Sequence, residues 1–515
     1  MAVPRPEPDP PTPTEVPVDT SDATRPRDAS LGSDASDRPP LTSAPGADGA
    51  RLGWKARIFG SDEFFRLWVV QLMSSLGDWL AFSAIILLAT DIGGGSAAGA
   101  VSLVMAARIV PGFLFGPVAG VLVDRWDRKK VMVTCNLGRA LVLGLLPFVE
   151  NVSGLVVASL LLEVMTLLWA PAKDAEVPNL VPHDHLTTAN SLSLAAAYGT
   201  FPFAALLFAL LAWVSAWVGA VPGLGFLEND QMALAFYVDS AILIVAAWMI
   251  QRLPLSAKRP PRQHEGVAES ERAMGVALRG AIAELKEGWR EIAANHTVRA
   301  VNIGLATGLI GGGMLIPLGA VFSTDVLGAG AAGYGLFTTS LGFGVAVGAV
   351  GVSVLQKRLP KARVFVWSLF ASGLALFCAA SSSTLGVAVV FVFLMGVTVG
   401  PVYVVGFALL QESVPEHLRG RIFSSLNTLV RLCVLISMVA GPLLAAGLGR
   451  LSQALFESEL SVFGADVAVP GVRLALWLAA LIILGASLAA GASLRAGERR
   501  SRAQDARHPS RHSAP

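Results

Sequence analysis

Long apolar runs without charged residues constrain this chain more than any other feature of its sequence. Gly386–Leu410, for example, contains no Asp, Glu, Lys or Arg. About 20 mainly apolar residues suffice for a helix to cross a bilayer. Because the lipid interior offers no water to amide groups, only helices and closed barrels span it, and barrel strands alternate apolar with polar residues. The continuous runs therefore predict an all-α integral membrane protein.

Twelve spans are predicted, in two groups of six. The first group lies near 64–90, 97–123, 131–149, 154–175, 187–217 and 231–251, and the second near 300–324, 331–355, 364–382, 386–410, 425–449 and 471–494. We expect the long fifth span to tilt or kink at Pro202. Two landmarks recur in both halves, namely a charged hairpin (Asp124–Lys130, Gln356–Arg363) and a Val-Pro pair (Val181-Pro182, Val414-Pro415). Such repeats predict a 6+6 architecture of two six-helix bundles.

The segments outside the spans differ in composition and divide the chain into five parts. The predicted parts are a disordered cytoplasmic tail at 1–58, an N-terminal bundle at 59–252, a cytoplasmic linker at 253–298, a C-terminal bundle at 299–494 and a basic cytoplasmic tail at 495–515. The first tail is rich in proline and acids and poor in residues that build a core. Within the linker, apolar residues at helical spacing over 273–294 predict an amphipathic helix on the membrane surface. We expect the basic tail to lie against anionic lipid.

The distribution of Lys and Arg predicts the orientation of the chain. If both termini are cytoplasmic, the cytoplasmic loops carry nearly all loop Lys and Arg, and the opposite side carries only Arg450. Positive residues stay on the cytoplasmic side. We therefore expect a multi-pass protein of the cytoplasmic (inner) membrane with both termini inside.

Several classes of function are disfavoured by what the sequence lacks. It has no Gly-rich nucleotide loop, no nucleophile elbow and no metal-ligand spacing. Cys135, Cys378 and Cys433 fall in predicted spans without pairing and are interpreted as packing residues. We expect neither an enzyme nor a cofactor or metal, and no nucleic-acid partner. A monomer in contact with membrane lipid is the expected state.

A charged loop after the second span is the most specific motif. It reads Gly120-Val-Leu-Val-Asp124-Arg125-Trp-Asp-Arg128-Lys129-Lys130 and resembles the signature loop of the major facilitator superfamily, with Asp127 where that family usually has glycine. Gly120 would let two helices approach closely. The resemblance implies that Asp124, Arg125, Arg128 and Lys129 form a gating latch that can bridge to the other half when the inner side is closed. The alternative is a positively charged stop without a gating role.

Further short motifs resemble one branch of that superfamily, which includes macrolide-efflux and enterobactin-exporter proteins. They are Leu67-Trp68, Gly77-Asp78-Trp79, Ala107-Arg108, Phe115-Gly116-Pro117, Ala189-Asn190-Ser191-Leu192, Gly333-Tyr334-Gly335-Leu336 and Gln411-Glu-Ser-Val-Pro415 with Leu418-Arg419-Gly420-Arg421. The resemblance covers about 64–494 and implies a central cavity and export of a small molecule by proton antiport. The substrate is expected to be amphipathic, like a drug or a siderophore.

Charged residues inside predicted spans are costly and usually functional. The candidates for substrate or proton coupling are Asp78, Arg108, Arg139, Glu163 and Arg431. Asp78 leads, because burial and a nearby arginine would act on its protonation in opposite directions.

Structural alternatives to these roles stay open. Asp78 could form a permanent ion pair with Arg108 or Arg139, Glu163 could make a structural hydrogen bond, and Arg431 could extend to the headgroups. Asp239, near the outer end of the sixth span, is interpreted as a capped or water-facing acid.

Two functions compete with the drug-like exporter. A lipid transporter of the same fold would move lysophospholipid instead of soluble drugs. A scaffold or sensor that does not transport would depend on residues 1–50 and be indifferent to Asp78→Asn.

Overall fold

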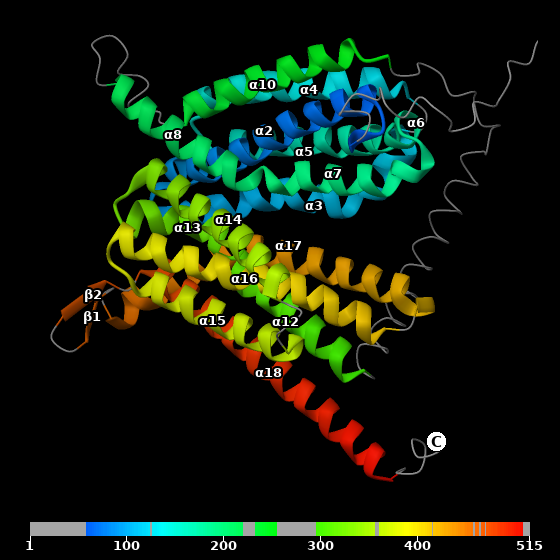
Figure 1. Cartoon of the computed structure of the whole chain (residues 1–515). Coiled ribbons are helices and arrows are strands. Elements are labelled where there is room, and N and C mark those ends of the chain that lie inside the picture. The colour runs from blue at the N-terminus through cyan, green and yellow to red at the C-terminus, as the bar shows by residue number, and fades with distance from the viewer. Residues whose placement is uncertain are drawn as a thin grey trace, which may run out of the picture. The chain divides into compact units, whose positions relative to one another are not determined.

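In the computed structural model, helices make up almost all of the described part of this chain (Figure 1). The structure describes residues 58–123, 126–219, 232–254, 295–355, 360–414, 416–456, 459–462, 465–468 and 470–507. All of the predicted tail at 1–58 except its last residue, and the predicted surface helix at 273–294, lie outside these ranges.

The helices of the N-terminal half follow the predicted spans closely. They are α2 (Asp62–Gly93), α3 (Ala97–Val123), α4 (Arg128–Leu145), α5 (Val152–Asp174), the short α6 (Val177–Leu180), α7 (Leu186–Gly199), α8 (Phe201–Gly219) and α10 (Ala233–Gln251). Local chemistry sets their starts: the Ser61 hydroxyl accepts from the Phe64 amide at the N-cap of α2. Asp62 and Glu63 then occupy the first turn, where negative charge stabilises a helix. Gly94, with φ of 46°, ends α2.

The C-terminal half repeats this plan. Its helices are α12 (His296–Gly313), α13 (Leu315–Val321), α14 (Gly330–Leu355), α15 (Lys361–Ser381), α16 (Leu385–Ser413), α17 (Glu416–Phe456) and α18 (Gly471–Arg507). A π-helical turn, Phe322–Val326, follows α13. In this half, α16 packs between α14 and α15, and α18 lies against α12, α15 and α17.

The twelve predicted spans are confirmed in the described residues. Eleven continuous helical runs are long and apolar enough to cross a membrane, and the first of them, Asp62–Gly112, combines α2 with the start of α3. The fifth span breaks at Thr200 into α7 and α8, two residues before Pro202, where a kink was expected. The seventh span breaks at Met314, after three consecutive glycines that end at Gly313, and this break was not predicted.

Two features differ from the sequence-based expectation. A β-hairpin, β1 (Glu459–Val462) with β2 (Ala465–Ala468), lies between α17 and α18, where only a loop was expected. The last helix runs to Arg507 instead of ending near 494, so much of the predicted basic tail is helical.

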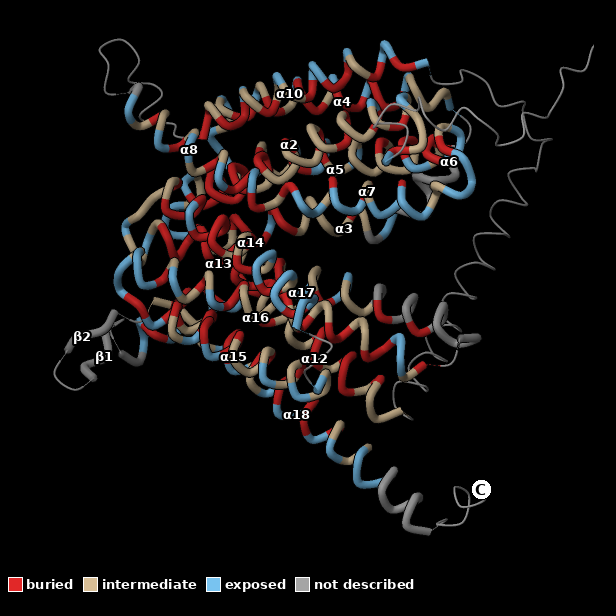
Figure 2. The backbone as a smooth tube through the Cα atoms, in the orientation of Figure 1, coloured by how far each residue is buried: buried red, intermediate tan, exposed pale blue. Residues whose placement is uncertain are grey.

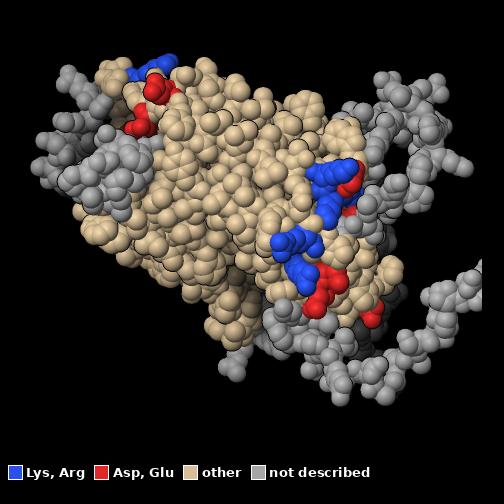
Figure 3. All heavy atoms as spheres, turned by 90° about the horizontal axis from the view of Figure 1, so that it is seen from above, with Lys and Arg blue, Asp and Glu red and all other residues tan. Residues whose placement is uncertain are grey.

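Apolar side chains cover much of the outside of the helices. Leu141, Val350 and Leu481 are each more than half exposed, and exposed positions alternate with buried ones along most helices (Figure 2). The face in Figure 3 carries its charged side chains near two opposite ends, with an uncharged surface between them. In water such a surface would be an aggregation liability, whereas a lipid bilayer accommodates it.

Backbones approach closely where glycines line the helices. A Cβ on Gly344 of α14 would lie 2.4 Å from the Phe393 carbonyl oxygen of α16, and one on Gly400 of α16 would lie 2.5 Å from the Val345 carbonyl oxygen of α14. Small residues at four-residue spacing favour such contacts between membrane helices.

The two halves also contact each other through described residues. Across α14 and α8, a Cβ on Gly335 would lie 2.7 Å from the Ala209 Cα, and one on Gly342 would lie 2.8 Å from the Pro202 Cβ. Across α3 and α17, the Ser102 hydroxyl donates to the Val439 carbonyl. These contacts lie toward the ends of the helices that are predicted to face outward.

Candidate functional site

The N-terminal half brings charged residues from five helices together inside the bundle. Asp78 of α2 forms an ion pair with Arg139 of α4, in which Arg139 Nη2 donates to Asp78 Oδ1. The Arg139 side chain is 3% exposed, whereas that of Asp78 is 33% exposed. The pair therefore joins a fully enclosed cation to an acid that solvent or a ligand can reach.

Arg108 of α3 and Glu163 of α5 belong to the same region. Glu163 acts electrostatically on both Arg108 and Arg139. A Cβ on Gly112 would lie 2.9 Å from Glu163 Oε1, so this glycine makes room for the acid. The Arg108 guanidinium lies 5.9 Å from the ring centre of Phe82, within cation–π range.

Asp239 of α10 is a member of this cluster that sequence reasoning misplaced. It was interpreted as a capped or water-facing acid, but it is 0% exposed and neither of its oxygens has a hydrogen-bond partner among the described residues. Its Oδ1 lies where a side chain on Gly77 would begin, because a Cβ there would be only 1.9 Å away. Asp239 also acts electrostatically on Arg139 and Arg108. The sequence feature that could have indicated this burial is the position of a charged residue within an apolar run.

Arg431, the fifth predicted coupling residue, is not described as part of this cluster. It lies in α17 of the other half and is exposed. It lies near the start of the apolar run Leu429–Ala454, where extension toward the headgroups would place an exposed arginine.

The charged loop is described only in part. Gly120 lies within α3, where it was placed by sequence, while Asp124 and Arg125 lie outside the described residues. Asp127 begins α4: its carboxylate accepts from the Lys130 amide at 3.2 Å, which is N-cap geometry. Asp127, at the position where the family usually has glycine, therefore caps the N-terminus of α4.

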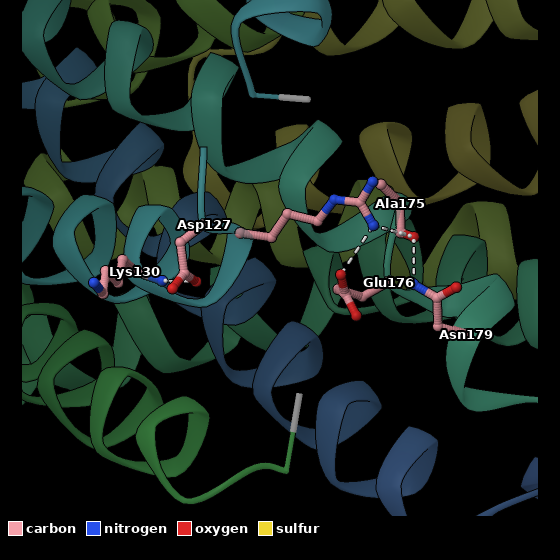
Figure 4. A network of polar contacts seen from close by, with 6 residues as sticks. Asp127, Lys130, Ala175, Glu176 and Asn179 are labelled. Carbon is pink, nitrogen blue, oxygen red and sulfur yellow. Dashed lines mark hydrogen bonds and ion pairs between the residues drawn. The ribbon is translucent and has the colours of Figure 1, made fainter. Parts of the chain in front are cut away.

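Arg128 and Lys129 bind groups of their own half. Arg128 Nη1 donates to Glu176 Oε1 at 2.9 Å and to the Ala175 carbonyl at 3.0 Å. Figure 4 shows the Glu176 carboxylate and the Ala175 carbonyl converging there, with Asn179 on the same carbonyl. Lys129 Nζ donates to the Leu253 carbonyl at 2.8 Å, beyond the end of α10. A bridge from the loop to the other half stays a prediction.

A second buried polar group links α2, α5 and α7 toward the predicted inner side. Lys173 Nζ donates to Gln71 Oε1 at 3.1 Å, and Gln71 Nε2 donates to the Ser193 carbonyl at 2.8 Å. Trp79, next to Asp78, donates to the Ala197 carbonyl of α7 at 2.9 Å. These bonds hold α2, which carries Asp78, against the broken fifth span. Nothing in the sequence near Gln71 indicates these partners.

The arrangement is suited to binding and charge exchange. The cluster offers a partly exposed carboxylate, two guanidinium groups and two further carboxyl groups within one bundle. No group of three or more His, Cys, Asp or Glu residues in the described part of the chain could hold a metal ion.

Comparison with protein families gives one family with nearly complete coverage. The family model described as Major Facilitator Superfamily matches residues 67–324 and 301–514. Among curated relatives, the putative bacilysin exporter BacE of Bacillus amyloliquefaciens is 28% identical over 411 residues, covering 75% of this chain and 91% of the relative. Macrolide efflux protein A of Streptococcus pyogenes is 24% identical over 397 residues, covering 75% and 90%.

Solved structures share the fold at low sequence identity. A bacterial homologue of the human lysosomal transporter Spinster, in an inward-facing and unoccupied conformation, aligns with a TM-score of 0.62 at 14% identity, covering 85% of this chain and 98% of the homologue. A bacterial metal transporter aligns with a TM-score of 0.55 at 16% identity, covering 84% and 98%. At such identities the likeness shows the fold alone.

Proposed function

Because the chain belongs to the Major Facilitator Superfamily, we propose that it exports a small amphipathic molecule, drug-like or siderophore-like, in exchange for protons. Its relatives include efflux-type proteins, named for bacilysin and macrolide export. Substrate class, direction and coupling ion belong to the proposal.

The observation that carries the proposal is the ion pair between Asp78 and Arg139. An arginine and a carboxylate inside a membrane bundle are expensive, and function is the default reason for their presence. Burial of an ion pair carries a desolvation cost that the attraction between its partners often fails to offset, so stability alone is a weak reason for the pair. Here the acid is one-third exposed while the cation is buried, so a proton or a cationic substrate can reach Asp78 and release Arg139.

Coupling follows from competition for Asp78. When Asp78 is ionised it holds Arg139, and the link between α2 and α4 is made. When Asp78 takes up a proton it loses most of its attraction for the guanidinium, and that link weakens. Glu163, which acts electrostatically on Arg139, and Arg108 supply the other charges that a substrate meets. A ligand shifts a conformational equilibrium only through different affinity for the two states, and this pair provides such a difference.

Alternating access requires that the halves part at one end while they close at the other. The contacts of α8 with α14 and of α3 with α17 would form the outer closure. We propose that the charged loop with Gly120, Asp124, Arg125, Arg128 and Lys129 belongs to the inner closure. In the state described, Arg128 is held by Glu176 within its own half.

The proposed setting is the cytoplasmic membrane, with both termini inside and a monomer as the working unit. The apolar surface between two charged ends is consistent with a bilayer around the helices. The placement of Lys and Arg supports the orientation.

Transport by the purified full-length chain in liposomes tests the proposal. An imposed pH gradient would drive uptake or release of amphipathic drugs, siderophores and lysophospholipids, tested one at a time. Asp78→Asn is the test variant. Asp91→Asn is the matched control, because Asp91 lies on the same helix but is exposed in its last turn.

We expect one drug-like or siderophore-like compound to move only with the gradient, in the unaltered protein and in Asp91→Asn but not in Asp78→Asn. Movement of lysophospholipid alone would replace the exporter with a lipid transporter. Absence of any transport by folded protein would refute the proposal and favour the scaffold.

A further inference from the structure

The charged cluster of the N-terminal half contains unequal numbers of acids and bases. It holds two arginines, Arg108 and Arg139, and three carboxyl groups, Asp78, Glu163 and Asp239. Arginine stays protonated in proteins. Net charge is penalised in a medium of low dielectric constant. The set is neutral only when one of the three carboxyl groups carries a proton.

The surroundings of the three acids differ. Asp78 is ion-paired and one-third exposed, and Glu163 is partly exposed, with Arg108 as its strongest charged neighbour. Asp239 is 0% exposed, and neither of its oxygens has a hydrogen-bond partner among the described residues. An ionised carboxylate with no partner is far more costly to bury than a neutral carboxylic acid.

Arg139 is bonded to one acid, Asp78, and interacts electrostatically with a second, Asp239. Its Nη2 is bound to Asp78, while its Nη1 is buried and has no hydrogen-bond partner in the described part of the chain. Asp239 is its strongest electrostatic neighbour apart from that bonded pair. The Asp239 carboxyl sits against the backbone of Gly77, the residue before Asp78, so both acids adjoin the same turn of α2.

In the described part of the chain, the charged groups around Asp239 come from the elements that pack on α10 and from Arg108. The elements that pack on α10 are α2, α4, α8 and the 3-10 turn Leu146–Phe148. From α2 comes Asp78 and from α4 comes Arg139, while α8 and the turn have no titratable residue in their sequences. Beyond them, Arg108 acts on Asp239 electrostatically.

We propose that Asp239 holds the proton of this set in the state described, and that Arg139 changes partner from Asp78 to Asp239 when the proton moves. In that step the O–H bond of Asp239 breaks and the Asp78 carboxylate takes the proton, directly or through water. Arg139 then pairs with the Asp239 carboxylate, so the net charge of the set is unchanged. The exposed Asp78 exchanges its proton with the solvent. This second part rests on the proposed proton coupling, whereas the protonation of Asp239 does not.

Infrared spectroscopy of the full chain in lipid nanodiscs tests the assignment without any substrate. A protonated carboxylic acid has its own carbonyl stretching band, which shifts in heavy water. We expect that band at neutral pH in the unaltered protein and expect it to shift when aspartate is carbon-13 labelled. It should move in Asp239→Glu and stay in place in Asp78→Glu.

Three results would overturn the assignment. They are a band whose frequency does not shift with the aspartate label, a band that shifts in Asp78→Glu but not in Asp239→Glu, and the absence of any protonated-acid band. If Asp239→Glu does not fold, Gly77→Ala replaces it, because the added Cβ would press on Asp239 Oδ1 and move the band. Gly99→Ala, whose Cβ would meet nothing within 4 Å, is its control and should leave the band in place.

Transport separates the two parts of the inference. In Asp239→Asn, a pH gradient should no longer accelerate transport of the substrate across the liposome membrane. Gradient-driven transport at the unaltered rate would refute the exchange of partners. If the infrared assignment holds but the unaltered protein transports without moving protons, Asp239 remains the protonated acid and proton coupling is refuted.

Discussion

A single added methyl group at Gly335 should open the outer contact between the halves. A Cβ there would lie 2.7 Å from the Ala209 N, Cα and Cβ atoms, closer than real Cβ contacts. Since backbone and not a flexible side chain is in the way, the helices must move apart. Overpacking of this kind costs about 1–3 kcal/mol. That cost applies only to the closed state, in which α14 contacts α8. Gly335→Ala should therefore lower the population of the closed state relative to the open state by about 5–150-fold.

Labelling of an outer cysteine measures this shift. Ser102 is 2% exposed and lies at the contact of α3 with α17. Ser102→Cys therefore reports opening, in a background with Cys135, Cys378 and Cys433 replaced. A membrane-impermeant maleimide is added from outside. When opening and closing are fast, the labelling rate follows the open population, so we expect it to rise severalfold to a hundredfold in Gly335→Ala.

Gly351→Ala is the matched control. Gly351 lies on the same helix, but a Cβ there would meet nothing within 4 Å, so labelling should stay at the reference rate. Equal rates in both variants would refute the idea that the contact of α14 with α8 closes the outer side. Equal acceleration by both would point to a general loosening of α14.

Three further predictions concern stability, measured as unfolding of the protein in detergent. Arg128→Ala leaves the Glu176 carboxylate buried without its arginine and should lower stability by about 3–5 kcal/mol. Lys130→Ala, at an exposed position, is the control and should change stability by less than about 0.5 kcal/mol. If both variants lose the same stability, the ion pair is unimportant. Trp79→Phe removes one hydrogen bond to α7 and should cost about 1 kcal/mol, and unchanged stability would contradict the role of that bond. Gly344→Ala should lower stability by about 1–3 kcal/mol through contact with the α16 backbone, while Gly386→Ala, with open space around it, should not.

The sequence predicted the number and order of the spans because hydrophobicity and length are properties of single segments. Asp78 and Arg139 stood out for the same reason, since a charge in an apolar run is visible without a structure. Sequence gives the depth of a residue along its span but not the face on which it lies. Asp239 was therefore misjudged: only six residues into α10, about 9 Å at 1.5 Å per residue, it faces α2 instead of water.

Features that depend on partners far along the chain were not accessible. The break at Met314 follows glycines, and glycines occur both at helix breaks and at close helix contacts. Their pattern in the sequence does not distinguish a break from a contact. The ion pair of Arg128 was not predicted, because nothing near it in sequence indicates Glu176, 48 residues away. The β-hairpin at 459–468 carries only a short alternating pattern between the last two spans.

The close glycine contact of α14 with α16 limits how the C-terminal half can move. Gly344 and Gly348 of α14 meet Gly396 and Gly400 of α16 backbone to backbone, with no side chain between them to change rotamer. A flexible layer could absorb a displacement of one helix, but two interlocked backbones transmit it. Any force that separates α14 from α8 must therefore carry α16 along, and α15 with it, since α15 packs on α16. The C-terminal half would then rotate as a rigid body, and the extent of opening at one end would determine the extent of closing at the other.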